Sequence, residues 1–216
     1  DPVVPLVTPE VNGALLEKRH GIIANPNCST IGIVMALAPL ARAARLLQLV
    51  VSTYQSVSGA GSEALEELDR GVRAGLDGDP PARADGTPPF AFNVIPRIDR
   101  FEANGYTREE MKVVWETRKI LDLPVLPVVC SAVRVPVRVG HGATVHAVFD
   151  RAITPDAARA LWAAFPGLEV MDDPARVHDE PIEELFADQL RCADLIVVSK
   201  ADLVGETELA TIAAGI

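Results

Sequence analysis

The 216-residue sequence lacks the marks of several large classes of protein. No apolar run is long enough to cross a bilayer, and no signal peptide opens the chain. Basic residues are in the minority, 20 against 30 acidic ones, and the formal net charge of −10 disfavours nucleic acid and anionic membranes. We therefore expect partners that are neither membranes nor nucleic acids.

Cysteine and histidine are scarce as well. The three cysteines, Cys28, Cys130 and Cys192, are odd in number and far apart, which is typical of a reducing compartment without a disulfide framework. None of the four histidines has a ligand partner at the spacing of a zinc site. The sequence therefore predicts a cytoplasmic protein without a metal site.

What is present is an ordinary globular balance, 49% hydrophobic and 23% charged residues, in which strand-like and helix-like segments alternate. Thr107 with Glu110 forms a capping box at the start of one helix, and Thr154 followed by Pro155 starts another. One predicted helix covers residues 62–76, and the helix that starts at Thr107 extends to about residue 121. Predicted strands cover residues 21–24, 47–55, 125–139, 143–150 and 168–171.

Residues 21–32 are the stretch around which the rest of the interpretation is built. A short apolar strand runs into a proline turn, and Cys28 then precedes a helix that Ser29 or Thr30 can cap. The free N–H groups at a helix N-terminus favour a thiolate and can also hold an oxyanion. The alternative is a buried cysteine that packs as a small apolar side chain.

Other polar residues allow two interpretations each. Glu109 and Lys112 share a helix face, either as a solvated ion pair or as site residues. Arg134 is either a strand-edge charge or an anion-binding group, and His141 is either a loop histidine or an acid/base group. A glycine-rich turn at residues 58–61 opens a helix, but no second strand with a terminal acid follows, so we reject a Rossmann assignment.

Several motifs together carry a family resemblance. The stretch around Cys28 resembles the nucleophile motif of aspartate-semialdehyde dehydrogenases, and the other matching segments follow in the family's order and spacing from about Val4 to Pro174. These segments are Asn27-Cys28-Ser29-Thr30, residues 51–61, residues 91–96, residues 116–121, and residues 133–137 with Gly140-His141.

The resemblance implies a fold and a domain organisation. Residues 1–174 would form an α+β catalytic and dimerisation domain, with a mixed β-sheet and helices mainly on one face, like the C-terminal domain of glyceraldehyde-3-phosphate-type dehydrogenases. The family's N-terminal dinucleotide-binding domain has no counterpart in this sequence. The implied partners are a small-molecule substrate and a second copy of the chain in a homodimer.

The resemblance also implies a reaction, the NADPH-dependent reductive dephosphorylation of L-aspartyl-4-phosphate to L-aspartate 4-semialdehyde in amino-acid biosynthesis. Cys28 would form a thioacyl intermediate, His141 would move protons and Gln55 would orient the substrate. The resemblance further implies that Arg134 binds the substrate α-carboxylate and that Glu109 binds the α-amino group. Lys112 and Asn27 would bind the phosphate. The nicotinamide end of NADP would be bound by the loop of Ser58, Gly59, Ala60 and Gly61.

The tail, residues 175–216, does not share the family resemblance of the preceding residues and is expected to form a short αβα segment. Ser199-Lys200-Ala201-Asp202 after an apolar strand resembles the guanine-specificity motif of CobW-type GTP-dependent metallochaperones. Ser199 departs from the usual Asn, and the sequence has no phosphate-binding Gly-x-x-x-x-Gly-Lys-Ser/Thr loop, so we favour a segment that merely packs on the main domain.

Three functions therefore stay open at the level of sequence. The first is an oxidoreductase half-enzyme that is incomplete as an isolated chain. The second is a non-catalytic dimerisation or interaction module, and the third is a GTP-binding metallochaperone fragment. Among enzymes the nearest rival is N-acetyl-glutamyl-phosphate reductase, whose motif tends to read Asn-Pro-Gly-Cys-Tyr where this chain has Asn27-Cys28-Ser29.

Overall fold

The computed structural model describes residues 3–17, 21–83 and 85–170, which belong to one compact unit. The expected αβα tail and the segment with the CobW-like motif lie outside the described residues.

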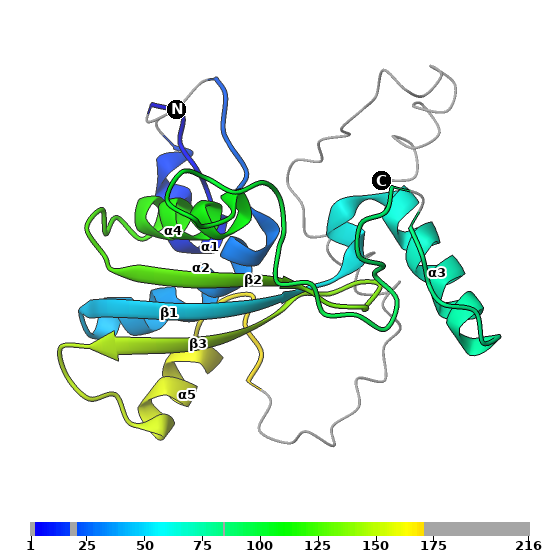
Figure 1. The fold of residues 1–216 in the computed structure, drawn as a ribbon. Helices are drawn as coiled ribbons and strands as arrows, with labels where there is room; N and C mark the ends of the chain where they lie inside the picture. Colours follow the sequence, from blue (N-terminus) through cyan, green and yellow to red (C-terminus); the bar gives the residue numbers. More distant parts are fainter. Residues whose placement is uncertain (1–2, 18–20, 84, 171–216) are drawn as a thin grey trace, which may run out of the picture. The chain divides into compact units, whose positions relative to one another are not determined.

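A three-stranded mixed sheet forms the centre of the described unit (Figure 1). Strand β1 (Leu46–Gln55) lies in the middle, parallel to β2 (Val128–Arg134) and antiparallel to β3 (Gly142–Phe149). Residues at every second position of β1, from Leu49 to Gln55, are buried, which is the period expected of a sheet with one covered face.

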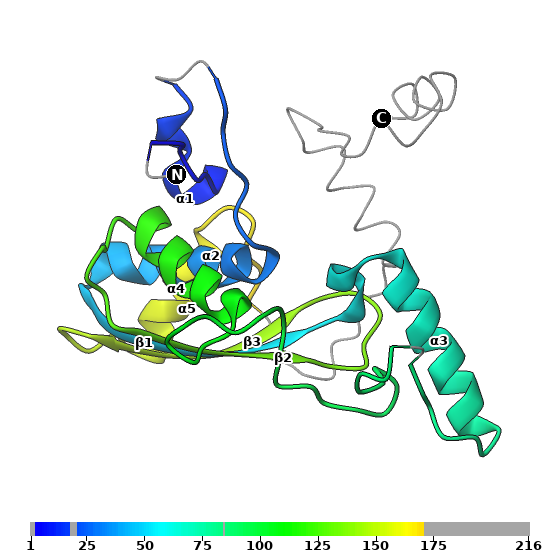
Figure 2. The same ribbon diagram turned by 45° about the horizontal axis from the view of Figure 1, so that its top comes forward.

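The helices that cover this sheet lie on one side of it (Figure 2). They are α2 (Cys28–Ala43), α4 (Arg108–Ile120) and α5 (Pro155–Ala163). The chain starts with the short α1 (Pro9–Asn12) and η1 (Gly13–Leu15), while η2 (Val57–Ala60) and α3 (Ser62–Leu76) follow β1. The predicted α+β class, a mixed sheet with helices mainly on one face, is confirmed.

The main core lies between the sheet and helices α2 and α4. Burial of these apolar side chains, at about 25 cal/mol per Å² of apolar surface, is the term that holds α2 and α4 against the strands. The buried residues of this main core are Ile33, Leu37, Leu46, Leu49, Val51, Val113, Val114, Leu126 and Cys130. A second cluster, around Val57, Leu68 and Phe90, packs under α3.

Three predicted strands differ from the structure. Residues 21–24 form only one bridge, Leu6 to Ala24, and residues 168–170 are not a strand. Strand β2 ends at Arg134 instead of continuing to residue 139.

The early end of β2 has a structural cause. Residues 135–141 cross the end of β1, where Val135 donates to the Gln55 carbonyl and Val57 donates to the Val137 carbonyl. Strands β2 and β3 are therefore not a hairpin, and the crossing brings His141 to the carboxyl end of β1.

Candidate active site

Cys28 is the first residue of α2, and the residue before it fixes the start of that helix. The Asn27 side-chain oxygen accepts hydrogen bonds from the backbone N–H of Ser29 at 3.0 Å and of Thr30 at 3.3 Å. Asn27 is therefore the cap, in place of the predicted Ser29 or Thr30, since both of these residues already lie inside the helix. An asparagine cap contributes about 1 kcal/mol to helix stability relative to alanine.

Two carboxylates of α4 hold this cap in place. Glu109 accepts a hydrogen bond from the Asn27 side-chain amide at 2.8 Å, and Glu116 accepts one from the Asn27 backbone N–H at 2.7 Å. Burial raises the pKa of Glu116, although its hydrogen bond from Asn27 opposes that shift. The side-chain amide and oxygen of Asn27 are thus already hydrogen-bonded to Glu109 and to the start of α2. The role in phosphate binding that the resemblance implies for Asn27 stays a prediction.

Glu109 joins three other predicted site residues. It is 5% exposed, and it accepts hydrogen bonds from Asn27, from the Gln55 amide at 3.2 Å and from Lys112 at 3.1 Å. Lys112 also pairs with Asp99 at 3.7 Å. Because Glu109 is buried inside a hydrogen-bond network, the interpretation as a solvated surface ion pair does not apply to it.

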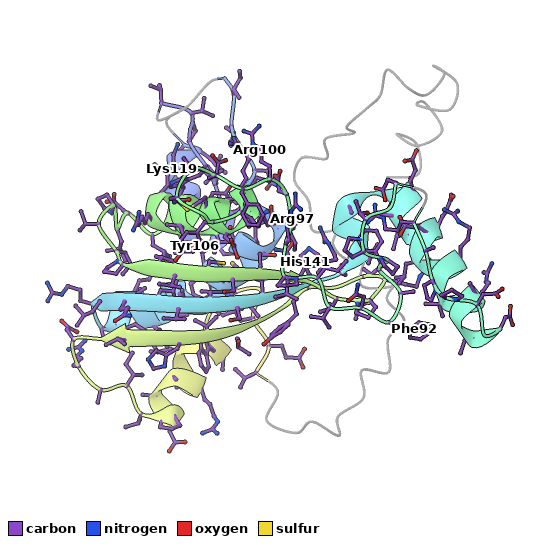
Figure 3. All side chains as sticks on the ribbon, in the orientation of Figure 1. Phe92, Arg97, Arg100, Tyr106, Lys119 and His141 are labelled. Atoms are coloured by element: carbon purple, nitrogen blue, oxygen red, sulfur yellow. The ribbon has the colours of Figure 1, made fainter. Side chains whose placement is uncertain are left out.

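The nucleophile candidate and the acid/base candidate are in direct contact. The Cys28 Sγ and the His141 Nε2 are 3.1 Å apart, although 113 positions separate them in the sequence. Figure 3 shows His141 at the end of the sheet from which β1 runs on to η2. Cys28 is exposed and His141 is half-buried, so the pair is open to a small molecule.

The other side of the His141 ring faces Ser56. The His141 Nδ1 lies 3.1 Å from both the backbone nitrogen and the Oγ of Ser56, whose Oγ is 2.9 Å from the Ser58 Oγ. Burial lowers the pKa of His141, and Arg134 adds to this effect, while the Gly140 carbonyl and Glu109 oppose it. A lowered folded-state pKa means that the ring is neutral at pH 7 and that its contribution to stability is lost only as the pH falls below about 6.5.

Arg134 is a buried cation beside this pair. It is 8% exposed, and its Nη1 donates to the Ser56 carbonyl at 2.6 Å. Burial lowers its pKa, which Glu109 and Cys28 counteract. Among the described residues no carboxylate forms an ion pair with Arg134, so its guanidinium is suited to an anionic ligand.

The loop at residues 58–61 approaches both Arg134 and His141. A Cβ on Gly59 would lie 3.2 Å from the Arg134 Nη1 and 3.6 Å from the His141 Cε1, so these two side chains pack against the glycine. The neighbouring Ser58 N–H is bonded to the Arg138 carbonyl, which holds η2 on the crossing segment. The absence of a side chain at Gly59 therefore lets Arg134 and His141 approach the backbone of η2 closely.

Two hollows flank the cluster. One, of about 280 Å³, lies between α2 and β3 and is lined by Cys28 and His141. The other, of about 310 Å³, is lined by Arg134, Ala60 and Arg97. A ligand that reaches both the thiol and the guanidinium would extend between these hollows.

Sequence reasoning missed three residues of this network: Ser56, Asp99 and Glu116. Glu116 follows Glu109 by seven residues, so helical spacing alone puts both on one face of α4 and could have indicated it. Asp99 has a positive φ of 70°, a strained conformation for a residue other than glycine, but this is visible only in the structure. Nothing in the sequence indicates Ser56.

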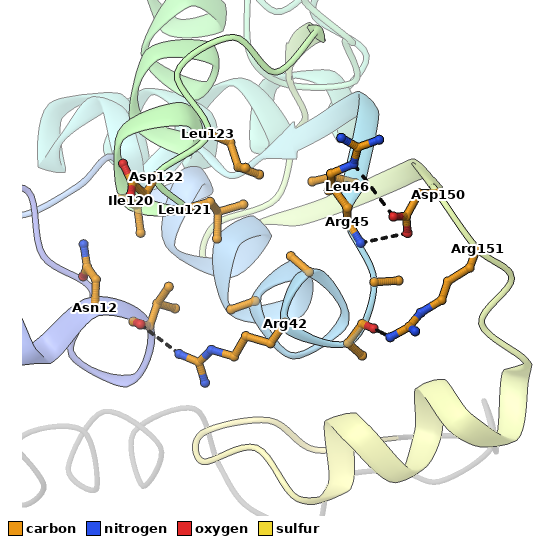
Figure 4. A pocket seen from close by; sticks show the side chains of 15 residues that line it. Asn12, Arg42, Arg45, Leu46, Ile120, Leu121, Asp122, Leu123, Asp150 and Arg151 are labelled. Carbon is orange, nitrogen blue, oxygen red and sulfur yellow. Dashed lines mark hydrogen bonds and ion pairs between the residues drawn. The ribbon is translucent and has the colours of Figure 1, made fainter.

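A larger cavity, of about 630 Å³, lies at the other end of α2 and gathers three arginines (Figure 4). Arg42 donates to the Val11 carbonyl, Arg45 pairs with Asp150, and Arg151 donates to the Ala43 carbonyl. Cations are favourable at a helix C-terminus, and each of these is already bonded. The cluster is therefore explained by the fold alone.

The described part of the chain contains no helix long and apolar enough to span a membrane, and no group of three or more His, Cys, Asp or Glu residues arranged to hold a metal ion.

Comparison with known proteins identifies the family. A model described as semialdehyde dehydrogenase, dimerisation domain, matches residues 37–193, which is well over half of the chain. The chain belongs to this family. The match begins after Cys28 and continues past residue 174, and the predicted boundary at 174 stays a prediction.

Similar proteins carry the name that the resemblance suggested. The semialdehyde dehydrogenase domain is 45% identical to the aspartate-semialdehyde dehydrogenase of Bacillus subtilis, over 82% of this chain and 53% of that protein. For the Legionella pneumophila enzyme the identity is 48%, over 79% of this chain and 50% of that protein. The chain thus spans about half the length of the curated relatives it matches.

Solved structures agree with the fold. The aspartate-semialdehyde dehydrogenase II of Vibrio cholerae has a TM-score of 0.75 and 44% identity, and it covers 82% of this chain while the chain covers 54% of it. The same enzyme has been solved in complex with ASA, with 43% identity to this chain. The resemblance of the semialdehyde dehydrogenase domain to aspartate-semialdehyde dehydrogenases is confirmed.

Proposed function

We propose that this chain is the catalytic half of an oxidoreductase that converts L-aspartyl-4-phosphate to L-aspartate 4-semialdehyde, with NADPH as reductant. The observation that carries the proposal is the 3.1 Å contact between Cys28 at the N-terminus of α2 and His141. A thiolate is both a strong nucleophile and a fair leaving group, which acyl transfer through sulfur requires.

The residues of the chain act in the following order. The Cys28 sulfur attacks the acyl carbon of the acyl phosphate, the carbon–oxygen bond to phosphate breaks, and a thioester forms on Cys28 while inorganic phosphate leaves. When bound, the dinucleotide supplies the hydride that reduces the thioester carbon. Hydride addition leaves an oxyanion on that carbon, to which His141 is assigned to donate a proton, giving the hemithioacetal. Return of this proton to His141 then breaks the carbon–sulfur bond, expels the Cys28 thiolate and yields the aldehyde.

The surrounding side chains match the charged groups of the substrate. Arg134 offers its planar fork to the α-carboxylate, and the buried carboxylate of Glu109 attracts the α-amino group. Gln55 and Glu109 are both buried and hydrogen-bonded to each other, so these two groups hold a fixed position. Lys112 donates to Glu109 at 3.1 Å and lies 3.7 Å from Asp99, and the longer contact with Asp99 is one that phosphate oxygens can replace.

Cofactor binding by this chain is limited to the nicotinamide end. We assign this contact to the loop formed by Ser58, Gly59, Ala60 and Gly61, whose Gly59 lies against the side chains of Arg134 and His141. The phosphate and adenosine contacts of NADP would belong to the half of the protein that this chain does not match.

The acylation half of the reaction tests this proposal without any cofactor. Mixing the chain with L-aspartyl-4-phosphate is expected to release about one phosphate per chain and to add one aspartyl group to Cys28, detected by phosphate assay and peptide mass spectrometry. Cys28→Ser is the control and should show neither product. Phosphate release without modification of Cys28 would contradict the proposal.

The chain is further proposed to form a homodimer through the uncovered face of its sheet. Tyr54, Val129 and Val148 are 42%, 44% and 36% exposed and alternate with residues that face the core, so they lie on the side away from the helices. An apolar face of this kind is typical of a subunit interface. A non-catalytic dimerisation module, the second candidate function, rests on the same face.

A matched pair of valines tests the interface. Val129→Lys, on the sheet face, is expected to shift the chain from dimer to monomer in light scattering coupled to size exclusion, because a lysine ammonium would be buried. Val125→Lys is the control, since Val125 is 87% exposed in the loop before β2. Equal masses for the two variants would contradict an interface on this face.

The proposed compartment is the cytoplasm. Cys28 and Cys130 are both free thiols in the structure, which supports a reducing environment.

A further inference from the structure

His141 receives a hydrogen bond that constrains its protonation. The Ser56 backbone nitrogen lies 3.1 Å from the His141 Nδ1 and satisfies the geometry of an N–H donor. A backbone N–H can donate but never accept, so Nδ1 must offer a lone pair to it. The neutral ring then carries its only hydrogen on Nε2, which is the nitrogen 3.1 Å from the Cys28 Sγ.

We propose that Ser56 is a positioning residue whose backbone N–H fixes His141 as the Nε2–H tautomer, so that in the resting protein His141 donates a hydrogen bond to the Cys28 sulfur. His141 then offers the Cys28 sulfur a neutral hydrogen-bond donor. In this state His141 cannot take the thiol proton, because Nε2 has no free lone pair. The inference rests on the proposed function only for the catalytic roles of Cys28 and His141.

Ser56 is well placed to hold the ring rigidly. It is fully buried, and its carbonyl accepts the hydrogen bond from Arg134 at 2.6 Å, so one residue contacts both His141 and Arg134. The Ser56 Oγ, also 3.1 Å from Nδ1, is bonded to the Ser58 Oγ and can donate or accept. Only the backbone N–H has a fixed direction, and it therefore decides the tautomer.

Groups on several helices and strands surround the His141 ring and affect its protonation. Arg134 of β2 disfavours the imidazolium, while Glu109 of α4 and the Gly140 carbonyl favour it. Cys28 of α2 faces Nε2. An imidazolium would direct an Nδ1–H at the Ser56 N–H, so protonation at low pH requires Nδ1 to turn from that N–H toward an acceptor such as the Ser56 Oγ or the Gly140 carbonyl.

Nitrogen NMR of the ¹⁵N-histidine-labelled chain reads the tautomer directly. At a pH where the ring is neutral, His141 is expected to show a protonated Nε2 and an unprotonated Nδ1, with its signals assigned by their loss in His141→Asn. His146, exposed on β3, serves as an internal reference for an unconstrained ring. A protonated Nδ1, or a mixture like that of His146, would overturn the proposal.

Two variants separate the backbone N–H from the hydroxyl. Ser56→Ala removes the Oγ and keeps the N–H, so the Nε2–H tautomer should persist; its loss would overturn the assignment to the backbone. Ser56→Pro removes the N–H, and the Ser56 φ of −66° already matches a proline, so the tautomers should become mixed.

The wild type and Ser56→Ala decide the question even where Ser56→Pro does not fold. A role of Ser56 in packing alone would leave the tautomer unchanged in a folded Ser56→Pro, and that result would refute the proposal. Neither measurement requires turnover, so a failed acylation of Cys28 with an intact Nε2–H signature would reject the proposed reaction and leave this inference standing.

Discussion

Alkylation of the native chain at pH 8 is expected to modify Cys28 and to leave Cys130 unreacted. Cys28 is exposed at the start of α2, and its sulfur lies 3.1 Å from the His141 Nε2. Cys130 is 1% exposed in β2, and burial raises its pKa to about 12. At pH 8 only a fraction of about 10⁻⁴ of such a thiol is ionised, before its lack of access is counted.

Peptide mass spectrometry after limited treatment with iodoacetamide measures the two rates. Replacing Cys192, which lies outside the described residues, with serine leaves two thiols to compare. Cys28→Ser should remove nearly all labelling of the folded chain, and unfolding in urea should bring Cys130 to the rate of a free cysteine. Protection of Cys28 in the folded state would instead support the buried structural cysteine that the sequence left open.

Little or no NADPH-dependent reduction of aspartyl phosphate is expected from the isolated chain, even where Cys28 becomes acylated. Transfer of hydride requires the nicotinamide to be held against the thioester carbon, and most of the binding energy for that placement comes from remote parts of the cofactor. The contact proposed for this chain is limited to the loop at residues 58–61, and the chain spans about half the length of its curated relatives.

A longer protein in which a dinucleotide-binding half precedes this chain should regain turnover, measured as loss of NADPH absorbance. In that protein Cys28→Ala is expected to lower kcat by about 10⁴-fold or more, the scale seen when a catalytic nucleophile is removed. A Leu76→Ala change, on an exposed side chain at the end of α3, provides the control and should leave the rate unchanged. Robust reduction by the 216-residue chain alone would refute the incompleteness argument.

Local patterns in the sequence were sufficient where the forces are local. The capping box of Thr107 and Glu110, the cap at Thr154 and the span of α3 from Ser62 to Leu76 all depend on residues within a few positions of one another, and the structure has them as predicted. The position of Cys28 at a helix N-terminus is of the same kind. Motifs in a fixed order then identified the family without any knowledge of the fold.

Local reasoning failed where a helix or strand ends through contacts with distant segments. The role of Asn27, instead of Ser29 or Thr30, as the cap of α2 is reinforced by Glu109 and Glu116, which lie on another helix and hold its amide and its backbone N–H. Strand β2 stops at Arg134 because the following residues must cross the end of β1. Neither of these long-range contacts lies within the window of residues from which a cap or a strand end is predicted.

The sequence by itself determined the class of fold, the family and the residue types available for chemistry, because these depend on periodicity, caps and ordered motifs. Only the tertiary structure decided how those residues meet. Ser56 reaches His141, and His141 reaches Cys28, across separations of 85 and 113 positions. Such contacts depend on strand order and on the crossing segment, which are set by packing of the whole sheet against its helices and not by any local pattern.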